Sequence, residues 1–170
     1  MSAQAATPTQ LHVFADPAEF TPFFGWKKDR SGKKEFVYCE GVPLVAAAEK
    51  FGSPLYLYSK AAIESAFREL DGGVGELPHR LCFAVKSNGN LSILKTLARL
   101  GSGFDVVSGN ELLHLQHLGV PGERIVFSGV GKSREEIRAA LQYNGKKRGK
   151  AGGILLFNVE SEEELGVLLD

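Results

Sequence analysis

The sequence predicts an α/β fold with a parallel β-sheet. Short apolar strands alternate with helices from residue 55 onward, and three of these helices open with a serine–glutamate capping pattern. Parallel neighbouring strands need a long crossover connection, which a helix supplies. Doubly wound sheets and (β/α) barrels both show this alternation, so periodicity alone leaves the two architectures open.

Five strand–helix units are predicted, and their strands are apolar on both faces, as in a sheet covered on both sides. The strands are expected at Leu55–Tyr58, Leu81–Val85, Gly103–Val107, Arg124–Phe127 and Ile154–Phe157. The helices are expected at Lys60–Leu70, Leu91–Leu100, Asn110–Leu118, Arg134–Gln142 and Glu162–Leu169. In each capping pattern the serine oxygen is expected to accept a backbone N–H while the glutamate reaches back. The three pairs are Ser108 with Glu111, Ser133 with Glu136, and Ser161 with Glu164.

The residues before this alternation divide into two segments. Residues 1–34 form a weakly patterned lead-in with aromatic side chains near its end. Residues 35–54 predict a strand around Phe36–Cys39, a turn at Gly41 and a short helix at Leu44–Phe51. Residues 55–170 are then the main domain, which contains the strand–helix units.

Composition excludes several classes of function. The chain has 170 residues, 44% of them hydrophobic, and 20 basic against 20 acidic residues give zero net charge. That balance favours neither a nucleic-acid partner nor an anionic membrane. Residues 1–10 lack the charged and apolar regions of a secretory signal, and the two cysteines, Cys39 and Cys82, do not suggest a disulfide framework. A cytoplasmic protein is therefore expected.

The segment that carries the chemistry is the strand at Leu81–Val85 with Lys86 after it. Strand alternation predicts that Cys82 and Ala84 share one face with Lys86, and that the large apolar residues face the covering helices. Active sites lie at the carboxyl ends of the strands in both sheets and barrels. A lysine at such a place can form a Schiff base with an aldehyde, or it can simply reach solvent.

Several segments resemble one family. Residues 83–88, Phe-Ala-Val-Lys-Ser-Asn, resemble the cofactor-lysine motif of alanine-racemase-like barrels. Residues 103–112 resemble the third-strand signature of diaminopimelate decarboxylases, and residues 52–58 and 157–165 resemble two further segments of those enzymes in the same order. The chain is therefore similar, over about residues 35–170, to the N-terminal part of this family.

The resemblance implies a partial (β/α)8 barrel that binds pyridoxal 5'-phosphate through Lys86. It further implies decarboxylation of meso-2,6-diaminopimelate to L-lysine, with an amino acid as the small-molecule substrate and a homodimer as the full-length enzyme. Asp105 would point into the barrel with Lys86, where its carboxylate could pair with the lysine or the substrate amine, or could be a structural acid. Asn158 closes the fifth strand and could line the same pocket or serve as a turn residue.

The family's pattern also implies that parts of the active site lie beyond residue 170. Five units take up 116 residues, whereas a whole barrel has eight strands and about 250 residues. The chain is therefore expected to be an inactive N-terminal fragment whose strand at Phe36–Cys39 belongs to a separate β domain and lacks its partners.

Other interpretations stay open. A sister decarboxylase would act on ornithine, arginine or carboxynorspermidine, and a non-catalytic carrier of pyridoxal phosphate or an inactive relative would perform no reaction. Gly129–Ser133 invites a phosphate-loop interpretation, but such a loop needs a glycine where Val126 stands. His114 and His117 have metal-ligand spacing on one helix, although no second pair of ligands accompanies them, so no metal is expected.

Overall fold

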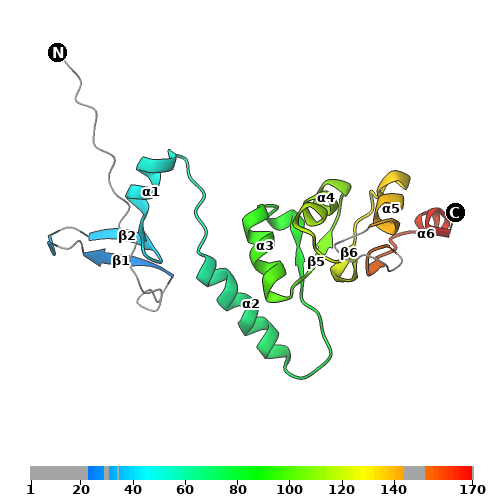
Figure 1. Cartoon of the computed structure of the whole chain (residues 1–170), viewed down its shortest axis with the longest axis horizontal. Coiled ribbons are helices and arrows are strands. Elements are labelled where there is room, and N and C mark those ends of the chain that lie inside the picture. Colours follow the sequence, from blue (N-terminus) through cyan, green and yellow to red (C-terminus); the bar gives the residue numbers. More distant parts are fainter. Residues whose placement is uncertain (1–22, 29–30, 34, 144–151, 170) are drawn as a thin grey trace, which may run out of the picture. The chain divides into compact units, whose positions relative to one another are not determined.

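Strands and helices alternate over residues 82–169 (Figure 1). The computed structural model describes residues 23–28, 31–33, 35–143 and 152–169. Most of the predicted lead-in, including residues 1–10, lies outside these ranges. Backbone contacts divide the chain into two units, Met1–Ser65 and Ala66–Asp170.

The first unit contains a small antiparallel sheet. Its strands are β1 (Phe24–Lys28), β2 (Glu35–Cys39) and β3 (Val42–Pro43), and helix α1 (Leu44–Phe51) follows directly. The prediction that the strand around Phe36–Cys39 lacks partners was wrong. It pairs with both neighbours, because the aromatic cluster before it forms β1 and places Trp26 opposite Val37.

A glutamate in the β2–β3 turn ties this sheet to the next helix. Glu40 has φ +53°, and its carboxylate accepts hydrogen bonds from the Ser59 hydroxyl (2.6 Å) and from the Ala61 backbone N–H (2.9 Å). Ser59 Oγ in turn accepts a bond from Ala62 N at 2.9 Å. These oxygens satisfy N–H groups that the first turn of α2 (Lys60–Val74) would otherwise leave without partners.

The strand expected at Leu55–Tyr58 is absent from the structure, and that prediction was wrong. Leu55, Tyr56 and Tyr58 are all exposed in the described chain. A strand exists only where a neighbouring strand satisfies its backbone groups, and an apolar run does not specify that neighbour.

The second unit is built on a parallel sheet, as predicted. Its strands lie in the order β4 (Cys82–Ala84), β5 (Gly103–Val106), β6 (Ile125–Phe127) and β7 (Leu156–Phe157). Each pair of neighbours is parallel. The longer helices between and after the strands are α3 (Leu91–Leu100), α4 (Gly109–Leu118), α5 (Arg134–Leu141) and α6 (Glu162–Leu169). Two single helical turns are η2 (Val85–Ser87) and η3 (Gly122–Arg124).

The two faces of this sheet differ in burial. Four side chains of one face have no exposed area. They are Phe104, Val106, Ile125 and Phe127. Apolar residues of α3, α4 and α5 are buried as well, so the core of this unit contains helix and sheet side chains together. On the opposite face, Ala84, Asp105 and Val126 are only half-buried and Cys82 is exposed.

The serine caps form at all three predicted helix starts, but only one is a full capping box. Ser133 accepts from Glu136 N, and the Glu136 carboxylate accepts from Ser133 N. At the other two starts the glutamate accepts from the residue before the serine: Val107 N binds Glu111 Oε2 (2.8 Å), and Glu160 N binds Glu164 Oε2 (3.2 Å). Each carboxylate therefore fixes the chain where it leaves a strand.

We expect Ser133→Ala to lower the free energy of unfolding by about 1 kcal/mol, because it removes the N-cap of α5. Urea denaturation monitored by circular dichroism measures the change. Ser92→Ala is the matched control, since the Ser92 side chain is exposed and caps no helix. Equal stabilities of the two variants would contradict the cap assignment.

Candidate functional site

Polar residues gather where the strands of the parallel sheet end. Lys86 follows β4, Ser128 follows β6 and Asn158 follows β7, while Asp105 lies one residue before the end of β5. Because the strands are parallel, these ends lie along one edge of the sheet. Catalytic and binding groups of α/β sheets and barrels lie at this edge.

Lys86 lies in a helical turn and not on the strand. Strand β4 ends at Ala84, and the turn η2 buries Val85 while it leaves Lys86 exposed. The predicted alternation of side chains therefore stops before the lysine. The turn is closed by two bonds to carbonyls, from Ser87 Oγ to Ala84 O (2.7 Å) and from Asn88 N to Val85 O (3.1 Å).

The residues after Lys86 hold the same loop by short-range hydrogen bonds. Asn88 Oδ1 accepts from Asn90 N at 3.0 Å, and Asn90 Oδ1 accepts from Ser92 N at 2.9 Å as the N-cap of α3. Side chains that bond to nearby backbone in this way fix turns. The polar residues of the Lys86 motif therefore determine where the lysine backbone lies.

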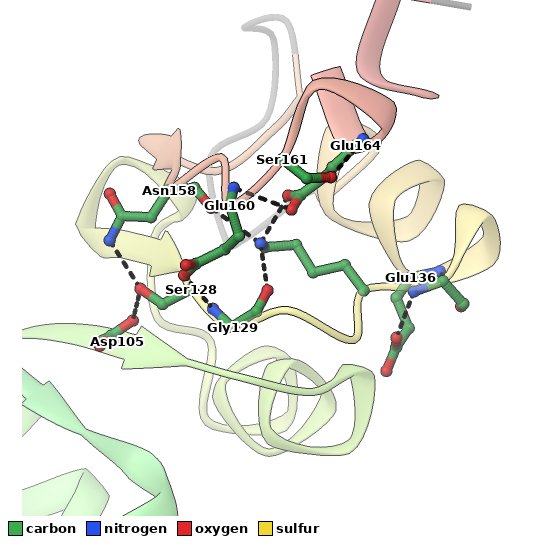
Figure 2. A network of polar contacts seen from close by, with 10 residues as sticks. Asp105, Ser128, Gly129, Glu136, Asn158, Glu160, Ser161 and Glu164 are labelled. Carbon is green, nitrogen blue, oxygen red and sulfur yellow. Dashed lines mark hydrogen bonds and ion pairs between the residues drawn. The ribbon is translucent and has the colours of Figure 1, made fainter. Parts of the chain in front are cut away.

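Asp105 lies on the less covered face of the sheet, directly beside Ala84 in register. Its Oδ1 atom accepts a hydrogen bond from Ser128 Oγ at 2.6 Å. Ser128 Oγ in turn accepts one from Asn158 Nδ2 at 2.8 Å. Figure 2 shows this chain of three side chains, which joins the ends of β5, β6 and β7.

Cys82 shares this face with Asp105. The residue is exposed overall, but partial burial of its thiol raises the thiol pKa. The positive charge of Arg80 lowers this pKa and the negative charge of Asp105 raises it, with a net rise. The thiol is therefore not poised as a nucleophile, since nucleophilic cysteines have lowered pKa values.

Lys132 joins two loops at the same edge. Its side chain has no exposed area, and its Nζ donates to Glu164 Oε1 (2.6 Å), Gly129 O (2.6 Å) and Asn158 O (2.9 Å). Three bonds use all the hydrogens of an ammonium group. This lysine is therefore committed to protein atoms, which argues against the phosphate-loop interpretation of residues 129–133.

The partners of Lys132 are themselves fixed. The Glu164 side chain is 10% exposed. Burial raises the pKa of its carboxyl, but the hydrogen bond from Lys132, the bond from Glu160 N and the charge of Lys132 outweigh burial, so the pKa is lowered. Glu160 Oε1 accepts from Gly129 N at 3.1 Å and closes the connection from the other side.

Glu136 extends the network toward β5. Its Oε1 atom accepts from Gly109 N at 2.6 Å, and backbone bonds from Ser133 and Gly109 lower the pKa of its carboxyl. A Cβ at Gly109 would lie 3.0 Å from the Glu136 Cγ atom, so a side chain there would press against the glutamate. Within the described ranges, no group of three or more His, Cys, Asp or Glu side chains could hold a metal ion.

One known protein family matches the part of the chain that contains this edge. The family model "Pyridoxal-dependent decarboxylase, pyridoxal binding domain" matches residues 60–170. The chain belongs to this decarboxylase family. The family resemblance seen in the sequence is confirmed.

Two curated relatives share the name diaminopimelate decarboxylase. A diaminopimelate decarboxylase of Pseudomonas fluorescens is 48% identical over 130 residues, which are 76% of this chain and 29% of that protein. One of Vibrio cholerae is 44% identical over 143 residues, which are 84% of this chain and 31% of that protein. The chain thus spans about three tenths of the length of these relatives.

Solved structures agree in fold. A protein of Aquifex aeolicus matches with a TM-score of 0.71 and 38% identity, over 89% of this chain and 34% of that one. Diaminopimelate decarboxylase of M. jannaschii in complex with L-lysine matches with a TM-score of 0.65 and 31% identity, over 84% of this chain and 31% of that one. The fold is therefore the predicted one, an α/β arrangement that forms part of a decarboxylase barrel.

The sequence predicted part of this edge. It singled out Lys86 and Asp105, and it considered Asn158 as a residue that could line the pocket. It missed Ser128 and the burial of Lys132, since nothing in the local sequence shows that a serine after one strand binds an aspartate 23 residues away.

No described helix has the length and apolar character that crossing a membrane requires. The predicted absence of a membrane partner rests on composition and stays a prediction.

We expect Glu164→Gln to reduce the loss of stability on acidification. A lowered folded-state pKa contributes stability that is present above the unfolded value, near 4.5, and is lost as pH falls through the folded value. Urea denaturation at pH 7 and at several values below 4.5 measures this loss. Part of it will remain in the variant, because the pKa of Glu136 is lowered too. An unchanged pH dependence would contradict the Lys132–Glu164 assignment.

Proposed function

We propose that this chain supplies the cofactor lysine of a diaminopimelate decarboxylase, with Lys86 as that lysine. The observation that carries the proposal is an exposed lysine at the carboxyl edge of a parallel sheet, beside a strand whose aspartate lies on the less covered face. Family membership supports pyridoxal 5'-phosphate as the group that the lysine binds.

The chemistry of the donor set fits this cofactor. Lys86 offers a primary amine, and the loop that carries it is fixed by the bonds of Ser87, Asn88 and Asn90. Among the described residues Asp105 has one hydrogen bond, through Oδ1, so Oδ2 is available to a cationic nitrogen. Lys86 would bind the cofactor, and the Asp105 carboxylate would pair with the nitrogen of the lysine or of the substrate amine.

Pyridoxal phosphate supplies an aldehyde for the lysine amine and a ring that accepts the electrons released when a substrate loses carbon dioxide. The protein's part is to hold these groups. A carboxylate next to the reacting nitrogen favours positive charge on it. In this proposal Lys86 would hold the cofactor and the Asp105 carboxylate would stabilise positive charge on the nitrogen beside it.

The substrate is proposed from the relatives. Two relatives that are 44% and 48% identical to this chain over the matched residues are named diaminopimelate decarboxylases. Two matching structures of that enzyme contain L-lysine, which is the expected product. A lysine/ornithine decarboxylase of Vibrio vulnificus in complex with cadaverine also matches, at 27% identity, and makes a diamine-forming reaction the second candidate.

The activity of the whole relatives is not assigned to these 170 residues alone, because they span only 29–34% of the relatives' lengths. Turnover is proposed to need residues that correspond to the other parts of those proteins. A homodimer and a cytoplasmic location remain predictions for the complete enzyme.

We expect the chain, treated with pyridoxal phosphate and then borohydride, to carry the reduced label on Lys86. Lys86→Ala should lose the label from this peptide, and Lys95→Ala is the matched control because Lys95 is an exposed lysine on the adjacent helix α3. Peptide mass spectrometry locates the label. Equal labelling of Lys86 and Lys95 would refute a specific cofactor site.

We expect no measurable release of carbon dioxide from meso-2,6-diaminopimelate by the 170-residue chain with pyridoxal phosphate. The physical reason is that the face bearing Asp105 is incompletely covered, so water would reach the reacting nitrogen. A radiometric assay with carboxyl-labelled substrate tests this. Turnover above that of the Lys86→Ala variant would contradict the expectation.

A further inference from the structure

The edge of the sheet contains a connected set of side chains that the cofactor lysine does not explain. Lys132 is fully buried in its side chain, yet it touches neither Lys86 nor Asp105 through any hydrogen bond. Burying an ammonium group is unfavourable unless every hydrogen is paired. Its three acceptors must therefore stay in place together.

Those acceptors lie on two separate segments. Gly129 belongs to the loop after β6, while Asn158 and Glu164 belong to the connection after β7 and to α6. Lys132 binds both segments, and the bond from Gly129 N to Glu160 adds a second link between them. The two loops are thus fixed relative to each other, as Figure 2 shows around Gly129, Asn158 and Glu164.

The same two loops carry Ser128, which donates to Asp105, and Asn158, which donates to Ser128. Ser128 precedes Gly129, and Asn158 provides both the carbonyl that Lys132 binds and the amide that Ser128 binds. Ser128 has a single hydrogen, which it donates to Asp105, so the amide of Asn158 occupies its acceptor side. The direction of the chain is therefore Asn158 to Ser128 to Asp105.

We propose that Asn158 and Ser128 form a hydrogen-bond relay that positions the Asp105 carboxylate. In this proposal Lys132 holds Asn158 and Ser128 at the right distance from each other, because it joins the two loops that carry them. These three are positioning residues, since none of them touches the reacting nitrogen. The relay fixes Oδ1 of Asp105 and leaves Oδ2 to interact with the group that Lys86 would bind. This last step rests on the proposed function.

The relay itself can be tested without cofactor. In ¹⁵N NMR spectra of the full chain, Ser128→Ala should shift the side-chain amide signals of Asn158, because their acceptor is lost. Glu164→Gln and Lys132→Met should shift them too, by releasing the loop, and the milder Glu164→Gln variant serves if Lys132→Met does not fold. Ser133→Ala is the control, because it weakens α5 without removing a bond of the relay. Unchanged Asn158 signals in the Ser128 and Glu164 variants would overturn the proposal.

The consequence for the cofactor has its own readout. The absorbance of the adduct between Lys86 and pyridoxal phosphate changes when the nitrogen that joins them is protonated. A carboxylate fixed near this nitrogen raises the pH midpoint of the change, because it favours the protonated form. Asp105→Asn should lower the midpoint by about 1 unit. Ser128→Ala and Asn158→Ala should lower it in the same direction by less, and Ser128→Thr, which keeps the hydroxyl, should restore it.

Other ionisable groups at this edge are accounted for. Among the described residues, the charges of Arg80 and Asp105 both act on the Cys82 thiol, and Cys82→Ser tests whether the thiol contributes to the midpoint. Four loop carboxylates each accept a hydrogen bond from a backbone N–H. They are unchanged in the Asp105, Ser128 and Asn158 variants, so they do not account for differences in the midpoint among these variants. The four carboxylates are those of Glu111, Glu136, Glu160 and Glu164.

The outcomes separate the two proposals. No adduct at Lys86 in the unaltered chain would refute the proposed function, and the NMR spectra would then decide the relay by themselves. An adduct whose midpoint moves with Asp105→Asn but not with Ser128→Ala or Asn158→Ala would leave the proposed function standing and overturn the positioning role of the relay.

Discussion

The register of the parallel sheet is the constraint on which the candidate site depends. Ala84 lies beside Asp105, and Asp105 lies beside Val126, so the end of each strand is set relative to the next. The fully buried face, with Phe104 and Phe127, holds this register, because a shift by one residue would move those rings to the less covered face. Packing on one side of the sheet thus determines which polar groups meet on the other.

The polar edge is ordered by two kinds of hydrogen bond. Around Lys86 the bonds are local, since Ser87, Asn88 and Asn90 bind backbone groups two or three residues away. Around Asp105 they are long-range, because Ser128 and Asn158 come from the two following strand ends. The position of the lysine is therefore encoded in its own motif, whereas that of the aspartate depends on how later units pack.

This difference explains how far the sequence could predict the structure. Helices α3 and α6 were predicted at their observed bounds, because their apolar spacing and start signals are local. The strand predicted at Leu55–Tyr58 failed, and β1 was missed, since pairing partners are not written in a short segment. Lys86 follows a strand of the parallel sheet, as predicted, but strand alternation could not predict that the turn η2 begins before it.

The buried Lys132 shows why such a site would use a charged residue for a structural task. A neutral side chain could fill the space, but it could not bind two carbonyls and a carboxylate at once. Removing any one acceptor leaves an ammonium hydrogen buried without a partner, which is strongly unfavourable. The loops after β6 and β7 therefore have one well-defined arrangement. Because Ser128 and Asn158 lie in those loops, the geometry at Asp105 depends on a charged group that makes no hydrogen bond to Asp105 itself.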